Sequence, residues 1–213
     1  MKNYNKRLYF IALILIVVSI TGCISIKSKY PESTYYKLTQ VKPANPDVAM
    51  LSTDNSIFIR DFEINSDIQT SKIVVSEDVN TIKRYNYHQW TAPLNDVITE
   101  FTMTRISNYG TFKKGVATSI YTSNPDYVLE CNILTCNINN HPNNVNNVEV
   151  SISAILQKSD HSTIQYVPVF SKTYTKIINR NDNSIESAVV ALSNAISQID
   201  DEILIDIFAN ITQ

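Results

Sequence analysis

Apolar and polar residues alternate from Val148 to Gln157, and Val148, Val150, Ile152, Ala154 and Leu156 fall on one face. Such a pattern predicts a half-buried antiparallel strand. Further β-prone runs between turn residues predict strands at 34–38, 56–60, 72–76, 81–87, 126–138 and 165–178. A hairpin turn is expected at 77–80, a turn or disordered tip at 139–147, and an edge position or bulge at Pro168.

A first helix is predicted by apolar residues that recur at the spacing of one buried helix face. Leu94, Val97, Ile98 and Phe101 form this face. Thr91 is the expected N-cap and Gly110 the expected C-cap.

A second, longer helix is predicted near the end of the sequence, with Asn183 in the cap role of a capping box. Its apolar stripe runs over more than five turns and comprises Ile185, Ala188, Val189, Leu192, Ala195, Ile196, Ile199, Ile203 and Ile207. We interpret Asp200, Asp201, Glu202 and Asp206 as its solvated face. A metal site there would need convergent ligands, and none can be identified.

The order of these elements predicts an α+β fold. Several strands precede a helix, and a strand meander precedes the long helix. We expect a mostly antiparallel sheet with two main helices, at about 92–108 and 184–210, packed on one face.

The N-terminus has the three parts of a bacterial lipoprotein signal. Lys2, Lys6 and Arg7 precede an apolar run, residues 8–18, that is short beside the ~20 residues of a membrane-spanning helix. Residues 20–23, Ile-Thr-Gly-Cys, form a lipobox. We therefore predict a cleaved signal peptide at 1–22, a lipidated tether at 23–33 and a single domain at 34–213. The alternative is an uncleaved anchor with a chance cysteine.

Cys23 is the one residue to which the sequence assigns a modification. We expect an S-diacylglycerol group and an N-acyl chain, which together hold a protein firmly on a membrane. Ile24 follows, where an aspartate would favour retention in the inner membrane. We expect the inner leaflet of the outer membrane, facing the periplasm.

Charge and composition exclude several functions. Removal of residues 1–22 leaves 191 residues with 15 Lys and Arg against 20 Asp and Glu, a formal charge of −5. This balance argues against a nucleic-acid partner, which requires basic surface. Only three glycines are present, which excludes glycine-rich phosphate loops.

Cys131 and Cys136 lie in one predicted strand. Five residues of extended chain span about 16 Å and place the two side chains on opposite faces. A disulfide needs Cα atoms within about 7 Å, so buried free thiols are expected unless a turn intervenes. The same geometry argues against a metal site with His141.

No catalytic constellation is visible, and no cofactor or metal site is predicted. Tyr85, Tyr87 and Trp90, with His88 between them, form the densest aromatic cluster. We interpret it as a core corner or a protein interface, with a ligand platform as the alternative. Asp61 and Glu63 could share a face, but a catalytic pair would need an apolar pocket that raises one pKa.

The mature chain resembles the ABC-type transport auxiliary lipoproteins, the family of the PqiC and YmbA lipoproteins. The resemblance rests on short motifs in a fixed order: the lipobox at Cys23, Tyr35-Tyr36-Lys37-Leu38, Lys72-Ile73-Val74-Val75, Ile82-Lys83-Arg84-Tyr85, Trp90-Thr91-Ala92-Pro93-Leu94, Pro125-Asp126-Tyr127-Val128-Leu129-Glu130 and the terminal helix. The match is sparse over residues 40–70.

The resemblance implies a non-enzymatic role beside a periplasmic MCE-domain protein of an ABC lipid transporter. The lipoprotein would dock that assembly to the outer membrane during phospholipid trafficking between the two membranes. Direct phospholipid binding and a homo-oligomer remain open. Two alternatives from other classes are a pilotin-like assembly lipoprotein, for a secretin or a lipopolysaccharide translocon, and a periplasmic lipid-modifying enzyme.

Overall fold

The computed structural model describes residues 31–43, 46–64, 68–78, 80–117, 124–141, 145–160, 162–163 and 165–211. The chain divides into two compact units, residues 1–32 and 33–213. The predicted signal peptide and Cys23 lie outside the described residues, so the fold below is that of the second unit.

One mixed sheet of nine strands and two long helices make up the described fold. The elements in chain order are β1 (Thr34–Tyr36), the 3-10 helix η1 (Pro46–Met50), β2 (Ile57–Ile59), β3 (Glu63–Ile64), β4 (Lys72–Asp78), β5 (Thr81–Trp90), α2 (Leu94–Tyr109), β6 (Val116–Ala117), β7 (Tyr127–His141), β8 (Val145–Asp160), β9 (Gln165–Asn179) and α4 (Ile185–Ile211).

The sheet is built on an antiparallel meander of the long strands β7, β8 and β9. The alternation predicted in β8 is confirmed, because Val148, Val150, Ile152, Ala154 and Leu156 are all buried. The free edge of β7 pairs in turn with β2, β3 and β4, each in parallel. β4 forms the predicted hairpin with β5, and β1 adds to β5 in parallel.

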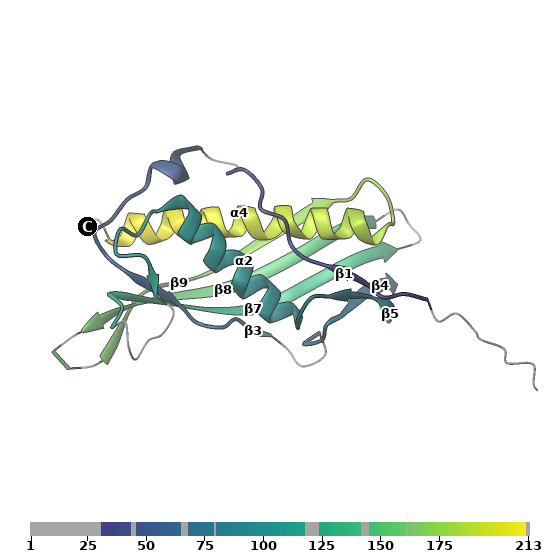
Figure 1. Cartoon of the computed structure of the whole chain (residues 1–213), viewed down its shortest axis with the longest axis horizontal. Coiled ribbons are helices and arrows are strands. Elements are labelled where there is room, and N and C mark those ends of the chain that lie inside the picture. Colours follow the sequence, from purple (N-terminus) through teal and green to yellow (C-terminus); the bar gives the residue numbers. More distant parts are fainter. Residues whose placement is uncertain are drawn as a thin grey trace, which may run out of the picture. The chain divides into compact units, whose positions relative to one another are not determined.

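Both helices pack on one face of this sheet, which confirms the predicted α+β class. Figure 1 shows α4 lying along β8 and β9, with α2 crossing it. The apolar stripe of α4 is buried throughout its length, from Ile185 to Ile207. Each fully buried Leu, Ile or Val side chain contributes roughly 1.5–3 kcal/mol relative to exposure, so this face drives the packing of the helix.

The predicted helix caps are partly wrong. Pro93, not Thr91, occupies the N-cap position of α2, without a side-chain cap. In α4 the cap role belongs to Ser184 instead of Asn183, since its Oγ accepts a hydrogen bond from the Ser187 N–H at 3.1 Å. Gly110 does end α2, in the left-handed conformation with φ 64°.

A β-bulge at Leu134 overturns the prediction that Cys131 and Cys136 face opposite sides. Ladder pairing with β8 shifts by one residue there, and Leu134 is left without a partner in the register. Cys131 therefore pairs with Ala154 and Cys136 with Val150, two positions on the same buried face. Both thiols are free and buried, as expected, and burial raises their pKa values above the ordinary one.

The ends of the meander differ from the prediction in length. β7 and β8 continue into the asparagine-rich segment as far as His141 and from Val145, which leaves only residues 142–144 between them. β9 pairs only with β8 among the described strands, and its register shifts next to Pro168. The edge position and the bulge expected at this proline are both present, since proline cannot donate to a ladder.

Replacement of Trp90 by alanine tests the packing at the end of β5. Trp90 is 2% exposed and belongs to the main core. We expect Trp90→Ala to lower the free energy of unfolding by about 3–5 kcal/mol, because a cavity replaces the indole ring. Urea denaturation followed by circular dichroism measures this loss. The exposed neighbour gives the control: Tyr87→Ala should change stability by less than about 0.5 kcal/mol, and equal losses would contradict the assignment.

Candidate functional site

The three aromatic residues singled out in the sequence do not lie together. Trp90 is in the core, Tyr87 is 42% exposed, and Tyr85 packs against the core while remaining partly accessible. Tyr85 meets the ring of His88 edge-on, with ring centroids 5.7 Å apart. The pairing of β1 with β5 brings in Tyr36, which stands out in the sequence only as part of a family motif and not as a member of this cluster.

Tyr36 joins three elements through its hydroxyl group. This group donates a hydrogen bond to Glu186 Oε1 of α4 at 2.8 Å, and His88 Nδ1 of β5 lies 2.8 Å away. Since the hydroxyl has one proton, His88 Nδ1 donates the second bond. Burial and the bond to Glu186 raise the pKa of Tyr36 to about 12. Hydrogen bonds from the backbone N–H of Glu186 and from the Tyr36 hydroxyl lower the pKa of the Glu186 carboxyl. The trio holds β1 against the rest of the fold, so we call it the β1 clasp.

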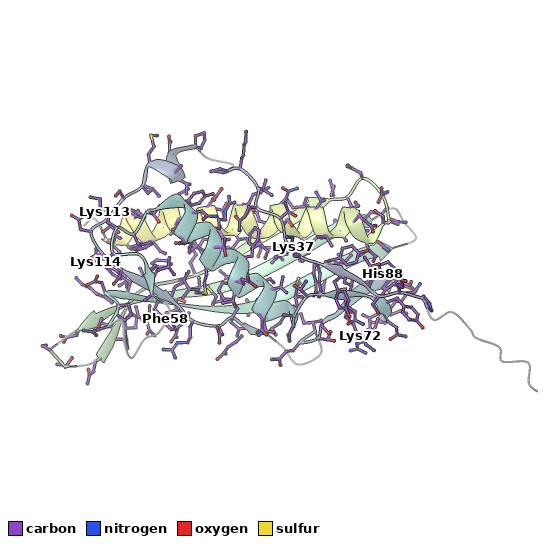
Figure 2. The ribbon with its side chains drawn as sticks, in the orientation of Figure 1. Lys37, Phe58, Lys72, His88, Lys113 and Lys114 are labelled. Atoms are coloured by element: carbon purple, nitrogen blue, oxygen red, sulfur yellow. The ribbon has the colours of Figure 1, made fainter. Side chains whose placement is uncertain are left out.

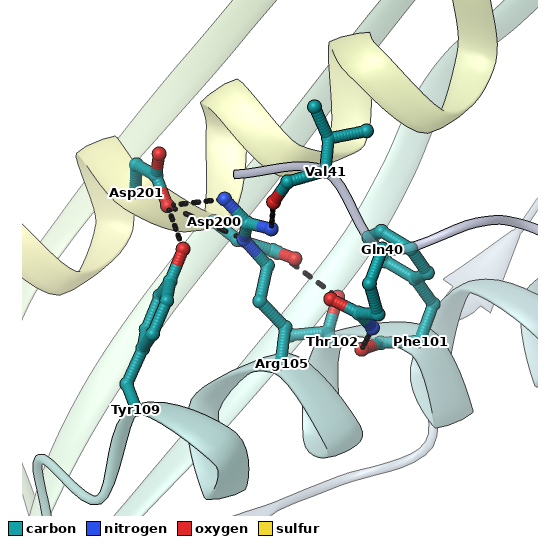
Figure 3. A network of polar contacts seen from close by, with 8 residues as sticks. All are labelled: Gln40, Val41, Phe101, Thr102, Arg105, Tyr109, Asp200 and Asp201. Carbon is teal, nitrogen blue, oxygen red and sulfur yellow. Dashed lines mark hydrogen bonds and ion pairs between the residues drawn. The ribbon is translucent and has the colours of Figure 1, made fainter. Parts of the chain in front are cut away.

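A buried ion pair joins the two helices (Figure 3). Arg105 Nη2 of α2 lies 2.8 Å from Asp201 Oδ1 of α4, and the two side chains are 2% and 5% exposed. The Tyr109 hydroxyl donates to the same carboxylate oxygen at 2.9 Å, and Arg105 Nη1 donates to the carbonyl oxygen of Val41. The pair thus also fixes the segment after β1. Desolvation and the bond to Asp201 raise the pKa of Tyr109 above its ordinary value.

Asp200 lies beside this pair and is completely buried. One carboxyl oxygen accepts a hydrogen bond from the Thr102 hydroxyl at 2.9 Å, and the other has no partner. Desolvation raises the pKa of Asp200 to about 8, although Thr102 and Arg105 act in the opposite direction. At neutral pH the carboxyl is therefore largely protonated. The network then has one positive charge, on Arg105, and one negative charge, on Asp201.

The acidic run of α4 is not the solvated face predicted from the sequence. Asp200 and Asp201 are 0% and 3% exposed, since Thr102, Arg105 and Tyr109 of α2 lie against them and the segment at Val41 contacts Arg105. The remaining two carboxylates point the other way and meet lysines of β9. Glu202 pairs with Lys176, and Asp206 pairs with Lys172 at 2.6 Å.

One sequence signal could have indicated this network. Arg105 lies four residues after Phe101 and seven after Ile98, so it continues the apolar stripe of α2. Asp200 likewise lies four residues after Ile196 on α4. An ionisable residue on each buried stripe indicates two faces that contact one another, because an isolated buried charge is very costly.

These groups offer little to a reacting substrate. The two buried carboxyls line none of the hollows described below. A surface hollow of about 390 Å³ is lined by Asp61 and Glu63, but its lining mixes four charged side chains with polar and apolar ones, and Arg60 pairs there with Glu130 at 2.9 Å. The apolar pocket that a catalytic pair would need is absent from this hollow. A second hollow, of about 240 Å³, lies between residues 37–40 and α2.

The described part of the chain also contains no group of three His, Cys, Asp or Glu side chains placed to hold a metal ion. Among the helices that the structure describes, none combines the length and the apolar character needed to cross a membrane.

Removal of one partner from the ion pair tests its contribution. Asp201→Asn leaves the Arg105 charge buried, and we expect a loss of about 3–5 kcal/mol in the free energy of unfolding. Arg105→Met combined with Asp201→Leu should cost less than either charge-removing single change, because no charge is then buried alone. Urea titrations of the single and double variants measure both effects. Asp54→Asn, in the exposed pair with Lys113, is the control and should leave stability unchanged.

Asp200 makes the stability of the fold depend on pH. Its pKa is about 8 in the folded state and ordinary, near 3.8, in the unfolded chain. Between these values the folded state keeps a proton that the unfolded chain has lost. Stability therefore falls as pH rises from 4 to 8, by up to about 1.4 kcal/mol per unit. Urea unfolding at pH 5, 6 and 7.5 should show this slope, and Asp200→Asn should remove it. An unchanged slope in the variant would assign the effect to other groups.

Comparison with known proteins gives the family. The model of the ABC-type transport auxiliary lipoprotein component matches residues 36–204, which is 169 of the 213 residues. No curated protein matches the chain in sequence. An auxiliary transport component is not an enzyme, which agrees with the expectation from the sequence.

Solved structures show that the fold is shared. Protein XCC0632 from Xanthomonas campestris, of the family DUF330, is 17% identical with a TM-score of 0.71, over 84% of this chain and 96% of that one. A second crystal structure, of an uncharacterized protein, is 12% identical with a TM-score of 0.63, over 83% and 99%. The chain belongs to the family of ABC-type transport auxiliary lipoprotein components.

Proposed function

We propose that the protein is a lipid-anchored, non-catalytic accessory component of an MCE-type ABC transporter, and that it serves phospholipid trafficking between the inner and outer membranes. The observation that carries the proposal is the family match over residues 36–204 behind a lipobox at Cys23. The family is one of transport auxiliary lipoproteins. The MCE-domain partner and the lipid cargo are the finer part of the proposal, and they rest on the resemblance of the short motifs.

The anchor is the first part of this proposal. The signal peptide, residues 1–22, is cleaved, and Cys23 receives an S-diacylglycerol group and an N-acyl chain. Residue 24 is Ile, which favours transfer to the inner leaflet of the outer membrane. Thr34, the first residue of β1, follows Cys23 by eleven positions. A tether of this length reaches at most about 40 Å, so the domain stays close to the bilayer.

A rigid docking module is the second part of the proposal. The β1 clasp and the Arg105–Asp201 pair connect the segment behind the tether to both long helices. A membrane anchor at Cys23 would therefore hold the whole domain, and not only its N-terminal strand, near the membrane. This is what a component that holds a transporter to a membrane needs, and it requires no catalytic group.

Affinity purification from solubilised envelopes tests the partner. We expect the tagged protein to bring down an MCE-domain protein together with the permease and ATPase of its transporter. Recovery of only a secretin or an outer-membrane β-barrel would contradict the proposal and favour a pilotin-like role. The Arg60→Ala variant, at an exposed pair, serves as a folded control for the effect of surface changes.

Cys23→Ser tests the anchor separately from the partner. The variant should lack the mass of the acyl groups and lose its membrane fractionation, because each buried methylene contributes about 0.8 kcal/mol to membrane binding. Circular dichroism and urea unfolding of the domain should be unchanged. Retained acyl mass in the variant would show that lipid is attached elsewhere.

A further inference from the structure

An exposed aromatic patch lies on the side of β1 and β5 that faces away from the helices. Tyr35 is 62% exposed, Ile82 is 52% exposed and Tyr87 is 42% exposed. Side chains along a strand alternate between the two faces of a sheet. The neighbours of Tyr35 and Tyr87, which are Tyr36 and His88, belong to the β1 clasp on the helix side. Tyr35 and Tyr87 therefore both point to the open side.

The same register places two basic residues on this open side. Ile73 and Val75 of β4 are fully buried, so the residues between and beside them, Lys72 and Val74, face outward. Lys72 pairs with Gln89, which in turn pairs with Tyr35, and Val74 pairs with Arg84. Figure 2 shows Lys72 at the same end of the sheet as His88. We call Tyr35, Tyr87, Ile82, Lys72 and Arg84 the tyrosine patch.

The charge of the tyrosine patch differs from that of the whole protein. The strands that form it, β1, β4 and β5, contain three basic residues against two acidic ones, Glu77 and Asp78 at the hairpin end of β4, a formal charge of +1, whereas the chain from residue 23 onward has a formal charge of −5. Tyrosine rings are enriched where a membrane meets water, and basic side chains attract anionic headgroups. The patch therefore combines two features that suit a phospholipid surface.

The position of the patch along the chain indicates which surface it contacts. Tyr35 follows Cys23 by twelve residues, so a lipid on Cys23 keeps this end of the domain at a high effective concentration beside the bilayer. We propose that the tyrosine patch rests on the phospholipid headgroups of the membrane in which Cys23 is anchored. Tyr35 and Tyr87 enter the interface, and Lys72 and Arg84 face the phosphates. This inference rests on the proposed anchor and sets the orientation of the domain above it.

Tryptophan quenching tests the patch in the lipidated full-length mature protein. The protein is placed in vesicles of phosphatidylethanolamine and phosphatidylglycerol with brominated acyl chains. Trp90 is buried and gives a constant background. A tryptophan introduced by Tyr35→Trp should lose emission to the bromine and shift to shorter wavelength, because its ring lies in the interface.

Val167→Trp is the matched control. Val167 is 54% exposed and pairs with Lys158 at one end of the β7–β8–β9 meander. The strand β4, which carries Lys72, contacts the meander at its other end, where Ser76 pairs with Asn139. Its emission should not depend on bromine. Equal quenching of both variants, or of neither, would overturn the proposal. Tyr35→Trp emission that changes with protein concentration instead of with bromine would overturn it in favour of contact between copies of the chain.

Mass spectrometry of the same samples tests the lipid anchor at Cys23 separately from the tyrosine patch. Acyl mass on Cys23 without quenching of Tyr35→Trp would contradict the patch and leave the anchor intact. A Cys23 without acyl groups would contradict the anchor itself, and the proposal would fall with it.

Discussion

The Arg105–Asp201 pair is the interaction on which the arrangement of the helical layer depends. A guanidinium and a carboxylate that are almost fully buried must stay together, because either charge alone in the core is strongly destabilising. This pair fixes the position of α2 on α4. Arg105 also donates a hydrogen bond to the carbonyl oxygen of Val41, which connects the segment after β1 to the two helices. Apolar contacts would allow the helices to slide; the fixed geometry of the pair and of the Tyr109 hydroxyl bond does not.

Neutral Asp200 makes this network compatible with the core. Two adjacent charged carboxylates opposite one guanidinium would leave a net negative charge among buried residues. Desolvation removes that problem by raising the pKa of Asp200 to about 8, so that one of the two carboxyls is uncharged. The same layer has its outer charges neutralised by lysines of β9, which reach α4 at Glu202 and Asp206. The long helix is thus held by ion pairs on two sides and by its apolar stripe on the third.

The two polar networks relate the fold to the proposed anchor. The β1 clasp fastens the first strand after the tether, and the helix network fastens the segment that follows it. Side-chain hydrogen bonds therefore connect the N-terminal part of the domain to both long helices, which suits the proposed anchor at that end. The open side of β1 and β5 remains available for other contacts.

Periodicity alone determined the class of the fold. The alternation in residues 148–157 and the stripes of the two helices predicted the α+β arrangement, because burial of one face imposes a period on each element. The predicted lipobox at Cys23 likewise comes from the sequence alone, since a linear motif needs no fold. What the sequence did not reveal depends on contacts between distant elements. The bulge at Leu134 reverses the face of Cys136, and a pattern of residue types does not show an extra residue in a ladder. Asp200 and Asp201 looked solvated because their helix is polar there. Only the crossing of α2 over α4, set by three-dimensional packing, buried them beside Arg105.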